Sequence, residues 1–433
     1  MTLHKIILVA LVLFSVSLNL SAQNQAPAEA QKGSVLIMNG KAHLGNTSVI
    51  ENSAIAFENG KLTLVADATV IRIDKRKYDN VIDATGKDIY PGFIACNTTL
   101  GLTEIDLIRA TRDYREVGEM NPNVRSIIAY STDSRIIPTV RSNGVLIAEI
   151  VPQGGRISGQ SSVVNLDAWN WEDAAVSMDI GIHMNWPRMT VPRMENAERE
   201  ENIRQKVKTE LADLDFYFSE AAAYAKNFSP PEANLRFEAM RGLFNGTKKL
   251  FVHCNNAKEI IAAVDLATRH KIKLVLVGAT DSWRLTALLK ENKIPVILNG
   301  THNLPPREDE DTDISYKLPF LLQQGGVQFA MSVDGSWQVR NLMFQAGTSE
   351  AYGLTTEQAI QSITSTPASI LGISDKLGTL EEGKDATLFI STGNALDMRT
   401  NHVTEAFISG RKINLDNAQK ELNKKFLGKY ELE

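Results

Sequence analysis

Two side chains that can move protons stand at the ends of predicted strands. His253 closes the apolar run 250–253, and Asp334 follows the apolar run 327–332. Imidazole and carboxylate groups act as general bases and also bind divalent metals. The carboxyl ends of parallel strands meet at one face of a barrel, so both residues are expected to be catalytic there. The structural alternatives are a helix N-cap for Asp334 and a hydrogen-bonded ring in a polar pocket for His253.

A second pair of polar side chains follows a short apolar stretch. Asn97 and Thr99 come after residues 89–94, which include the turn pair Pro91-Gly92. Residues two apart on a strand share a face, so both side chains are expected to point the same way. Amide and hydroxyl groups donate and accept hydrogen bonds but are poor zinc ligands. The pair is therefore predicted to bind substrate.

The stretch VIDATGKDIYPGFIACNTTLGL, residues 81–102, resembles the amidohydrolase superfamily, in particular its imidazolonepropionase-like branch. That family reads P-G-hydrophobic-I-D-x-H-x-H at this place, and its two histidines bind the catalytic metal. The present chain keeps Pro91 and Gly92 but has Asn97 and Thr99 where the histidines stand. The resemblance thus implies the fold of the family with a divergent metal site.

The resemblance extends along the chain. LFVHCNN around His253 matches the fifth-strand metal histidine, and Asp334 matches the last-strand aspartate that binds metal and takes a proton from the attacking water. Residues 376–390, KLGTLEEGKDATLFI, resemble the closing motif. The family's sixth-strand histidine has no counterpart at Val277 or Gly278. The resemblance therefore implies either one divalent metal such as Zn, held by the incomplete set of His253 and Asp334, or no metal.

Further candidates for substrate binding lie outside these strands. Residues 151–173, VPQGGRISGQSSVVNLDAWNWED, resemble a segment of the imidazolonepropionase-like branch, and Gln153 and Gln160 in it are expected to line a polar pocket. His302 follows the seventh predicted strand and is expected to reach the same mouth. Glu149 lies within a strand, and its direction stays open because a one-residue error in register reverses the face.

A barrel is predicted to position these residues. Over residues 91–375, buried apolar strands alternate with helical segments, as in an α/β, TIM-like (β/α)8 barrel. A helical elaboration is expected near residues 194–228. An open doubly wound sheet is the alternative, although no glycine-rich dinucleotide fingerprint follows any strand. The main predicted strands are residues 144–151, 250–253, 272–277, 295–298 and 327–332.

Residues 33–90 and 376–433 predict a second, smaller unit. Short strands in the first segment are separated by the turn pairs Asn39-Gly40 and Asn59-Gly60, which favours a small β-sandwich. The closing motif returns the chain to this unit. The sandwich is therefore expected to be built from both ends of the chain, with the barrel inserted between them.

The first residues match a cleavable secretory signal. Lys5 precedes the apolar run 6–20, and small residues follow at Ser21-Ala22. The run is shorter than the roughly 20 residues that span a bilayer, so cleavage of residues 1–22 is favoured over a membrane anchor. A periplasmic or secreted protein with no stable membrane span is expected, with residues 23–32 as a flexible leader.

Charge and cysteine content restrict the remaining possibilities. The 433-residue chain carries a formal net charge of -5, which does not indicate a nucleic-acid partner. Cys96 and Cys254 are the only cysteines, and their apolar surroundings predict buried free thiols. Arg125 and Arg340 would suit a substrate carboxylate, but surface pairing is the favoured interpretation of both.

Two functions compete on this evidence. The first is an exported hydrolase for a cyclic amide, imide or peptide-like C–N bond, in which Asp334 is the base and His253 holds a metal or polarises the carbonyl. The second is a non-catalytic protein that binds a small ligand on the same scaffold through Asn97 and Thr99. An intact scaffold with two reactive residues favours the hydrolase. The sequence leaves the substrate and the oligomeric state open.

Overall fold

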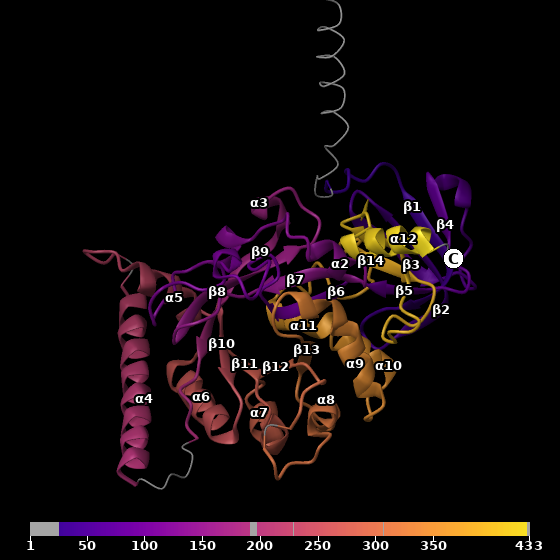
Figure 1. The fold of residues 1–433 in the computed structure, drawn as a ribbon. Coiled ribbons are helices and arrows are strands. Elements are labelled where there is room, and N and C mark those ends of the chain that lie inside the picture. Colours follow the sequence, from indigo (N-terminus) through magenta and orange to yellow (C-terminus); the bar gives the residue numbers. More distant parts are fainter. Residues whose placement is uncertain (1–25, 191–196, 228, 306, 431–433) are drawn as a thin grey trace, which may run out of the picture.

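The computed structural model describes residues 26–190, 197–227, 229–305 and 307–430. A closed barrel lies beside a separate sheet that contains both ends of the described chain (Figure 1). The predicted signal, residues 1–22, lies outside the described residues. Within the described parts of the chain, no helix combines the length and the apolar character that crossing a bilayer requires.

Eight strands close the barrel, which confirms the predicted architecture and excludes the open sheet. The main predicted strands are all present within a few residues of their expected bounds. Around the barrel the order is β10-β11-β12-β13-β6-β7-β8-β9. The strands are β6 (Phe93–Thr98), β7 (Val145–Ile150), β8 (Ile157–Asn165), β9 (Ala175–Asn185), β10 (Lys249–Cys254), β11 (Leu274–Gly278), β12 (Val296–Asn299) and β13 (Phe329–Ser332).

Strand β8 departs from the regular (β/α)8 pattern. It runs antiparallel to both β7 and β9, whereas the other neighbouring strands of the barrel are parallel. A single short helix, α3 (Trp171–Ala174), lies between β8 and β9. The sequence pattern did not predict either strand, because buried serines and glycines in β8 interrupt the apolar signal of a barrel strand.

Helices cover the outside of the barrel. Side chains cap the first N–H groups of some of them; Asn256 and Glu259, for example, form a capping box at α6. The long helix α4 packs against α5 and α6 at one side of the molecule and fills most of the predicted helical elaboration (Figure 1). The helices are α2 (Ile137–Arg141), α4 (Ala197–Ala225), α5 (Leu235–Phe244), α6 (Ala257–His270), α7 (Thr286–Glu291), α8 (Ile314–Gly325), α9 (Leu342–Glu350), α10 (Thr356–Gln361) and α11 (Ser365–Leu371).

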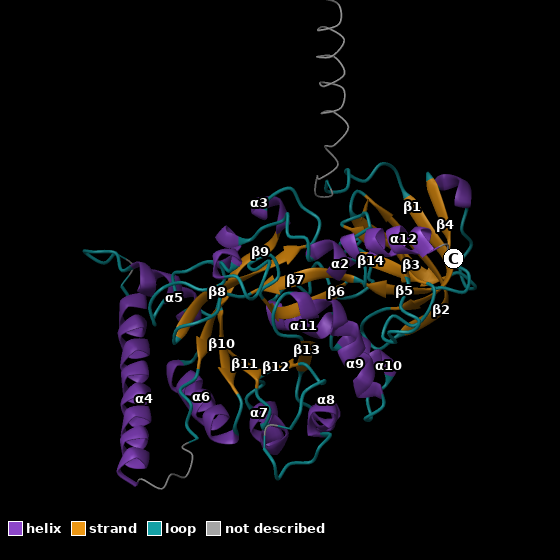
Figure 2. Cartoon of the chain, viewed as in Figure 1, coloured by secondary structure: helices purple, strands orange, loops and turns teal. Residues whose placement is uncertain are grey.

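The second sheet contains strands from both the N-terminal and the C-terminal segment, as was expected for the small β domain. Strand β14, from the C-terminal segment, pairs with β5 from the N-terminal segment (Figure 2). Apolar clusters cover both faces of the sheet. Helix α12 (Ala418–Tyr430) follows it. The strands are β1 (Val35–His43), β2 (Val49–Glu58), β3 (Lys61–Asp67), β4 (Asn80–Asp83), β5 (Asp88–Pro91), β14 (Leu388–Ser391), β15 (Val403–Ile408) and β16 (Arg411–Lys412).

The barrel interior is largely apolar, and both cysteines belong to its walls. Cys96 on β6 and Cys254 on β10 are buried free thiols, as predicted, and burial raises the pKa of both. Ile94, Phe251 and Val275 are among the side chains that fill the same core. A polar or charged group among these side chains therefore needs its own explanation.

Candidate active site

A cavity of about 630 Å³ opens at the carboxyl ends of the barrel strands. Asn97, Asn185 and Asn299 lie in the final residues of β6, β9 and β12, while Asp334 lies two residues beyond β13. Catalytic groups of barrel enzymes occupy this face, because loops from several strands converge there. The lining of this carboxyl-end cavity is Asn97, Thr99, Asp106, Tyr114, Pro152, Gln153, Gly154, Ser158, Asn185, His253, Asn299, Asp334 and Gly335.

Five residues singled out from the sequence line this one cavity. They come from four separate parts of the chain, and the barrel brings them together: Asn97, Thr99, Gln153, His253 and Asp334. The two proton-moving groups therefore share a common space with the predicted substrate-binding groups. Packing alone does not require a carboxylate and an imidazole to converge on one cavity.

Two other predicted substrate-binding residues lie elsewhere. Gln160 is buried on β8 and accepts a hydrogen bond from the Lys248 ammonium. Because β8 runs opposite to its neighbours, Ser158 reaches the cavity and the residues after it recede from the mouth. The ring of His302 bonds to Thr348 Oγ1 at 2.7 Å, which turns it towards helix α9. Neither side chain lines the cavity, so the expectation for both is corrected.

The cation candidates also lie away from the site. Arg125 forms an ion pair with Asp179 at 2.7 Å, which is the surface pairing that was favoured. The Arg340 guanidinium stacks 4.3 Å from the ring centroid of Trp337. No lysine or arginine is among the described residues that line the carboxyl-end cavity. The cavity is therefore poorly suited to holding a substrate carboxylate by an ion pair.

A buried chain of polar groups supports His253 from inside the barrel. His253 Nε2 lies 3.0 Å from His183 Nδ1, and His183 Nε2 lies 3.2 Å from Glu149 Oε1. The second oxygen of Glu149 accepts the main-chain N–H of Asn97 at 3.0 Å. The side chains of Glu149 and His183 are fully buried. This settles the open direction of Glu149, which points inward, and reveals His183 as a residue that sequence reasoning missed.

The side chain of Asn97, on β6, forms a hydrogen bond with Asp334. Its Nδ2 donates to Asp334 Oδ1 at 3.1 Å and approaches Asn299 Oδ1 at 3.4 Å. Its φ of 52° is in the left-handed region, which asparagine tolerates better than most residues. The Oδ1 atom of Asn97 is buried and has no hydrogen-bond partner among the described residues.

Burial changes the proton affinity of both reactive groups. Burial raises the pKa of Asp334, because a charged carboxylate is less stable away from water. Burial, together with repulsion from His183, lowers the pKa of His253 to about 3. His253 is therefore a neutral imidazole near pH 7. The raised pKa makes the Asp334 carboxylate a stronger proton acceptor than an exposed aspartate.

The donor set does not fit a resident catalytic metal. Zinc sites usually take three or four histidine, cysteine or carboxylate ligands that converge on one point. The cavity offers His253, Asp334 and Asp106, and these three do not form such a group. At the first strand the neutral Asn97 and Thr99 stand instead, and the Asn97 amide directs its N–H to the Asp334 oxygen that a cation would occupy. Among the described residues no group of three such ligands could hold a metal ion.

A smaller side cavity of about 280 Å³ adjoins the first one. Asn299 and Asp334 line both, so they stand at the junction. The side cavity is more apolar, since Leu298, Ile314 and Leu318 contribute to its walls. The carboxyl-end cavity is thus the more polar lobe and the side cavity the more apolar lobe. The Asp334 carboxylate lies where the two meet.

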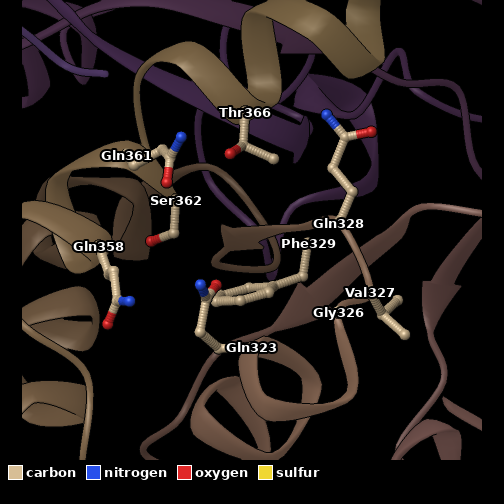
Figure 3. A pocket seen from close by; sticks show the side chains of 9 residues that line it. All are labelled: Gln323, Gly326, Val327, Gln328, Phe329, Gln358, Gln361, Ser362 and Thr366. Atoms are coloured by element: carbon tan, nitrogen blue, oxygen red, sulfur yellow. The ribbon is translucent and has the colours of Figure 1, made fainter. Parts of the chain in front are cut away.

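A third hollow at the opposite end of the barrel serves as a contrast. This amino-end hollow of about 290 Å³ lies at the start of β13 (Figure 3). Four glutamines contribute to its lining, namely Gln323, Gln328, Gln358 and Gln361. None of the described residues that line it has a titratable side chain. It offers hydrogen bonds but no acid or base, so it is not a candidate for catalysis.

Comparisons with known proteins agree with this architecture. Imidazolonepropionase of Brucella anthropi is 25% identical over 367 residues, covering 79% of this chain and 87% of that protein. Imidazolonepropionase of Mesorhizobium japonicum is 24% identical over 376 residues, covering 81% and 88%. Both alignments therefore cover nearly the whole of the relative.

Solved structures share the fold. An amidohydrolase from Thermotoga maritima superimposes with a TM-score of 0.75 at 23% identity, covering 88% of this chain and 99% of that one. A zinc-bound adenosine deaminase from Xanthomonas campestris gives 0.50 at 14% identity, covering 93% and 99%. The sequence model of the amidohydrolase family matches residues 146–413. The chain belongs to the amidohydrolase family.

Proposed function

We propose that this protein is a hydrolase that cleaves a carbon–nitrogen bond in a small amide by attack of water. The observation that carries the proposal is the meeting of Asp334 and His253 in one carboxyl-end cavity. Family membership and the imidazolonepropionase relatives support the same reaction class. Because function resides in the site and not in the fold, the residues of this chain must supply the chemistry.

Asp334 is the general base of the proposed reaction. Its carboxylate accepts a proton from a water molecule as the water oxygen attacks the carbonyl carbon of the amide. The same proton then passes to the leaving nitrogen, the C–N bond breaks, and an acid and an amine result. The Asn97 amide holds one oxygen of Asp334 in place at 3.1 Å. That hydrogen bond orients the base without neutralising it.

Neutral groups stabilise the charge that develops on the carbonyl oxygen. Asn299 Nδ2 has no hydrogen-bond partner within the described chain, while its Oδ1 lies 3.4 Å from Asn97 Nδ2. The free N–H groups of Asn299 therefore suit an oxyanion beside Asp334. The proposed reaction has no step through a metal, since the donor set does not fit one.

The two lobes indicate the kind of amide that fits. Gln153 and Tyr114 suit a polar group on one side of the bond, and Leu298 and Leu318 suit an apolar group on the other. No lysine or arginine lines either cavity in the described parts of the chain. A small amide without a carboxylate is therefore the proposed substrate class, and the propionate in the name of the relatives has no matching cation here.

Export is part of the proposal. Residues 1–22 carry the charge and apolar pattern of a cleavable signal, which supports action in the periplasm or outside the cell. Fractionation of cells that express the full chain tests this part. Cleavage near Ala22 and recovery outside the cytoplasm are expected, and an uncleaved cytoplasmic protein would contradict it.

A second candidate function is binding of a small ligand without turnover. Asn97 and Thr99, two neutral residues that line the cavity, favour it, since they hold a polar ligand without activating water. The decisive experiment incubates the purified protein with a library of small cyclic and acyclic amides and detects the released amine by mass spectrometry.

The matched variant in this experiment is Asp334→Asn. The amide of asparagine keeps the shape of the carboxylate but does not accept the proton. Turnover by the wild-type protein that falls about 10²–10⁴-fold in the variant supports the hydrolase. Binding of amides without turnover supports the second function, and equal turnover by both proteins would remove Asp334 from the mechanism.

A further inference from the structure

We infer that Glu149 and His183 are positioning residues that fix the tautomer of His253, with the hydrogen on Nε2 and a free lone pair on Nδ1. The evidence is the continuous chain of contacts from Glu149 through His183 to His253, at 3.2 Å and 3.0 Å. The catalytic consequence rests on the proposed hydrolase, whereas the tautomer itself does not.

The hydrogen positions follow from the end of the chain. An ionised carboxylate only accepts hydrogen bonds. Glu149 accepts the main-chain N–H of Asn97 on one oxygen, which leaves its other oxygen to accept from Nε2 of His183 at 3.2 Å. A neutral His183 then has a lone pair on Nδ1 and accepts from His253 Nε2. A neutral His253 with hydrogen on Nε2 has none on Nδ1.

Packing holds the middle of this chain rigidly. The ring of His183 stacks on Phe251 with centroids 4.6 Å apart and planes 4° apart. The side chains of Glu149 and His183 are completely buried in an interior that is otherwise filled by residues such as Ile147 and Val275. Burying a carboxylate in such surroundings is unfavourable unless it is fully hydrogen-bonded, and core packing alone does not call for one.

The consequence changes the role expected for His253. Within the described chain, Nδ1 of His253 has no protein partner, and the residue lines the cavity. An unprotonated nitrogen does not donate to a carbonyl oxygen, so His253 does not polarise the substrate in the expected way. It accepts an N–H or O–H from the substrate or water instead. Carbonyl polarisation is then left to the amide of Asn299.

Nitrogen NMR of the histidine rings tests the inference without a substrate. In protein labelled with ¹⁵N-histidine, long-range ¹H–¹⁵N spectra at pH 7 separate protonated from unprotonated ring nitrogens, and the loss of signals in His253→Gln identifies the ring of His253. The expected result is a protonated Nε2 and an unprotonated Nδ1. The opposite tautomer, or an equal mixture of both, in the wild-type protein would overturn the inference whether or not any variant folds.

Glu149→Gln tests the origin of the tautomer. The glutamine amide can donate to His183, so the fixed direction of hydrogen donation is lost and the other His253 tautomer is expected to become populated. Glu259→Gln is the matched control, because Glu259 is also a buried carboxylate but accepts main-chain N–H groups, including that of Met189, and touches no histidine. An unchanged His253 spectrum in Glu149→Gln would show that the relay, the chain of contacts from Glu149 through His183 to His253, does not set the tautomer.

Kinetics provide the functional readout once a substrate is in hand. Glu149→Gln is expected to lower kcat by about 10–100-fold, a usual effect of residues that orient a reacting group, with KM little changed. A merely structural role would lower the amount of folded protein and leave the kcat of the folded fraction intact. If the tautomer is confirmed and no amide is hydrolysed, the proposed function fails and the relay stands.

Discussion

Two histidines of this protein, His43 and His253, have opposite surroundings. His43 lies on β1 between Glu357 Oε1, 2.6 Å from Nδ1, and Asp88 Oδ1, 3.8 Å from Nε2, and it stacks on Tyr90. Although burial favours its neutral form, the ion pairs with Asp88 and Glu357 outweigh burial and raise its pKa. The neutral His253 has one histidine neighbour and a cavity, and its pKa is lowered.

The difference separates a structural histidine from a reactive one. His43 joins the small sheet to helix α10, since its Nδ1 lies 2.6 Å from Glu357 Oε1 and its Nε2 faces the Asp88 carboxylate at 3.8 Å. Both nitrogens therefore face carboxylates of the protein and not a cavity. His253 uses one nitrogen within the protein and has no protein partner within the described chain at the other. Burial of a histidine is therefore a weak sign of function, and the presence of an unused nitrogen beside a cavity is a stronger one.

Replacement of each histidine by glutamine should give the largest difference in amide turnover. His253→Gln is expected to lower amide turnover by about 10²-fold, because a positioned hydrogen-bond acceptor for substrate or water is lost. His43→Gln should leave the turnover of folded protein unchanged, since His43 lies outside both cavities. Steady-state rates corrected for the folded fraction measure this, and an equal loss in both variants would remove the distinction.

The two variants should also differ in stability, and here the larger loss is expected for His43→Gln. His43→Gln is expected to lower the free energy of unfolding by about 2 kcal/mol at pH 6, because hydrogen bonds to charged groups in the interior are lost. The raised pKa means that the contribution of His43 is fully present below its unfolded pKa of about 6.5 and is lost as the pH rises through the folded pKa. Urea unfolding at pH 6 and at pH 9 measures the change, and a loss that grows with pH would contradict it.

His253 should show the reverse dependence on pH. Its lowered pKa means that the folded protein resists protonation of this ring, so wild-type stability falls relative to His253→Gln as the pH drops from about 6.5 towards 3. Unfolding of both proteins at pH 7 and pH 5 is the measurement. Equal pH dependence of the two proteins would show that His253 is not the neutral buried group described here.

The smallest effect is expected at the amino-end hollow. Gln361→Ala removes one lining amide at that end of the barrel, where no acid or base stands. The free energy of unfolding should change by less than about 0.5 kcal/mol, as for most substitutions of partly exposed residues, and turnover should not change. A large loss of turnover would mean that the two ends of the barrel are coupled.

Sequence reasoning located the residues that end strongly apolar strands. Residues 250–253 and 327–332 have clear barrel patterns, so His253 and Asp334 could be placed at the carboxyl face before the structure was known. The same argument brought Asn97 and Thr99 into the cavity. The two-ended small sheet followed from the closing motif of residues 376–390.

The rest depended on register and strand direction, which local patterns do not encode. His183 was missed because β9 was not recognised as a strand, and Asp179 within it has a φ of 53° that breaks the regular alternation. Gln160 was expected to line the pocket, whereas it lies on a strand of reversed direction that carries it away from the mouth. The inward direction of Glu149 needed the register of β7 against its neighbours. The sequence did contain a signal for His183, since this residue stands in a stretch of alternating apolar residues just before Trp186.

In the proposed reaction Asp334 activates water without help from a bound metal. The amide turnover of purified protein after removal of metals by chelation, measured with and without added zinc and beside Asp334→Asn treated in the same way, tests this step. An unchanged wild-type rate after chelation and a loss of at least about 10²-fold in the variant are expected. Turnover that disappears on chelation and returns with zinc, or a variant as fast as the wild type, would contradict it.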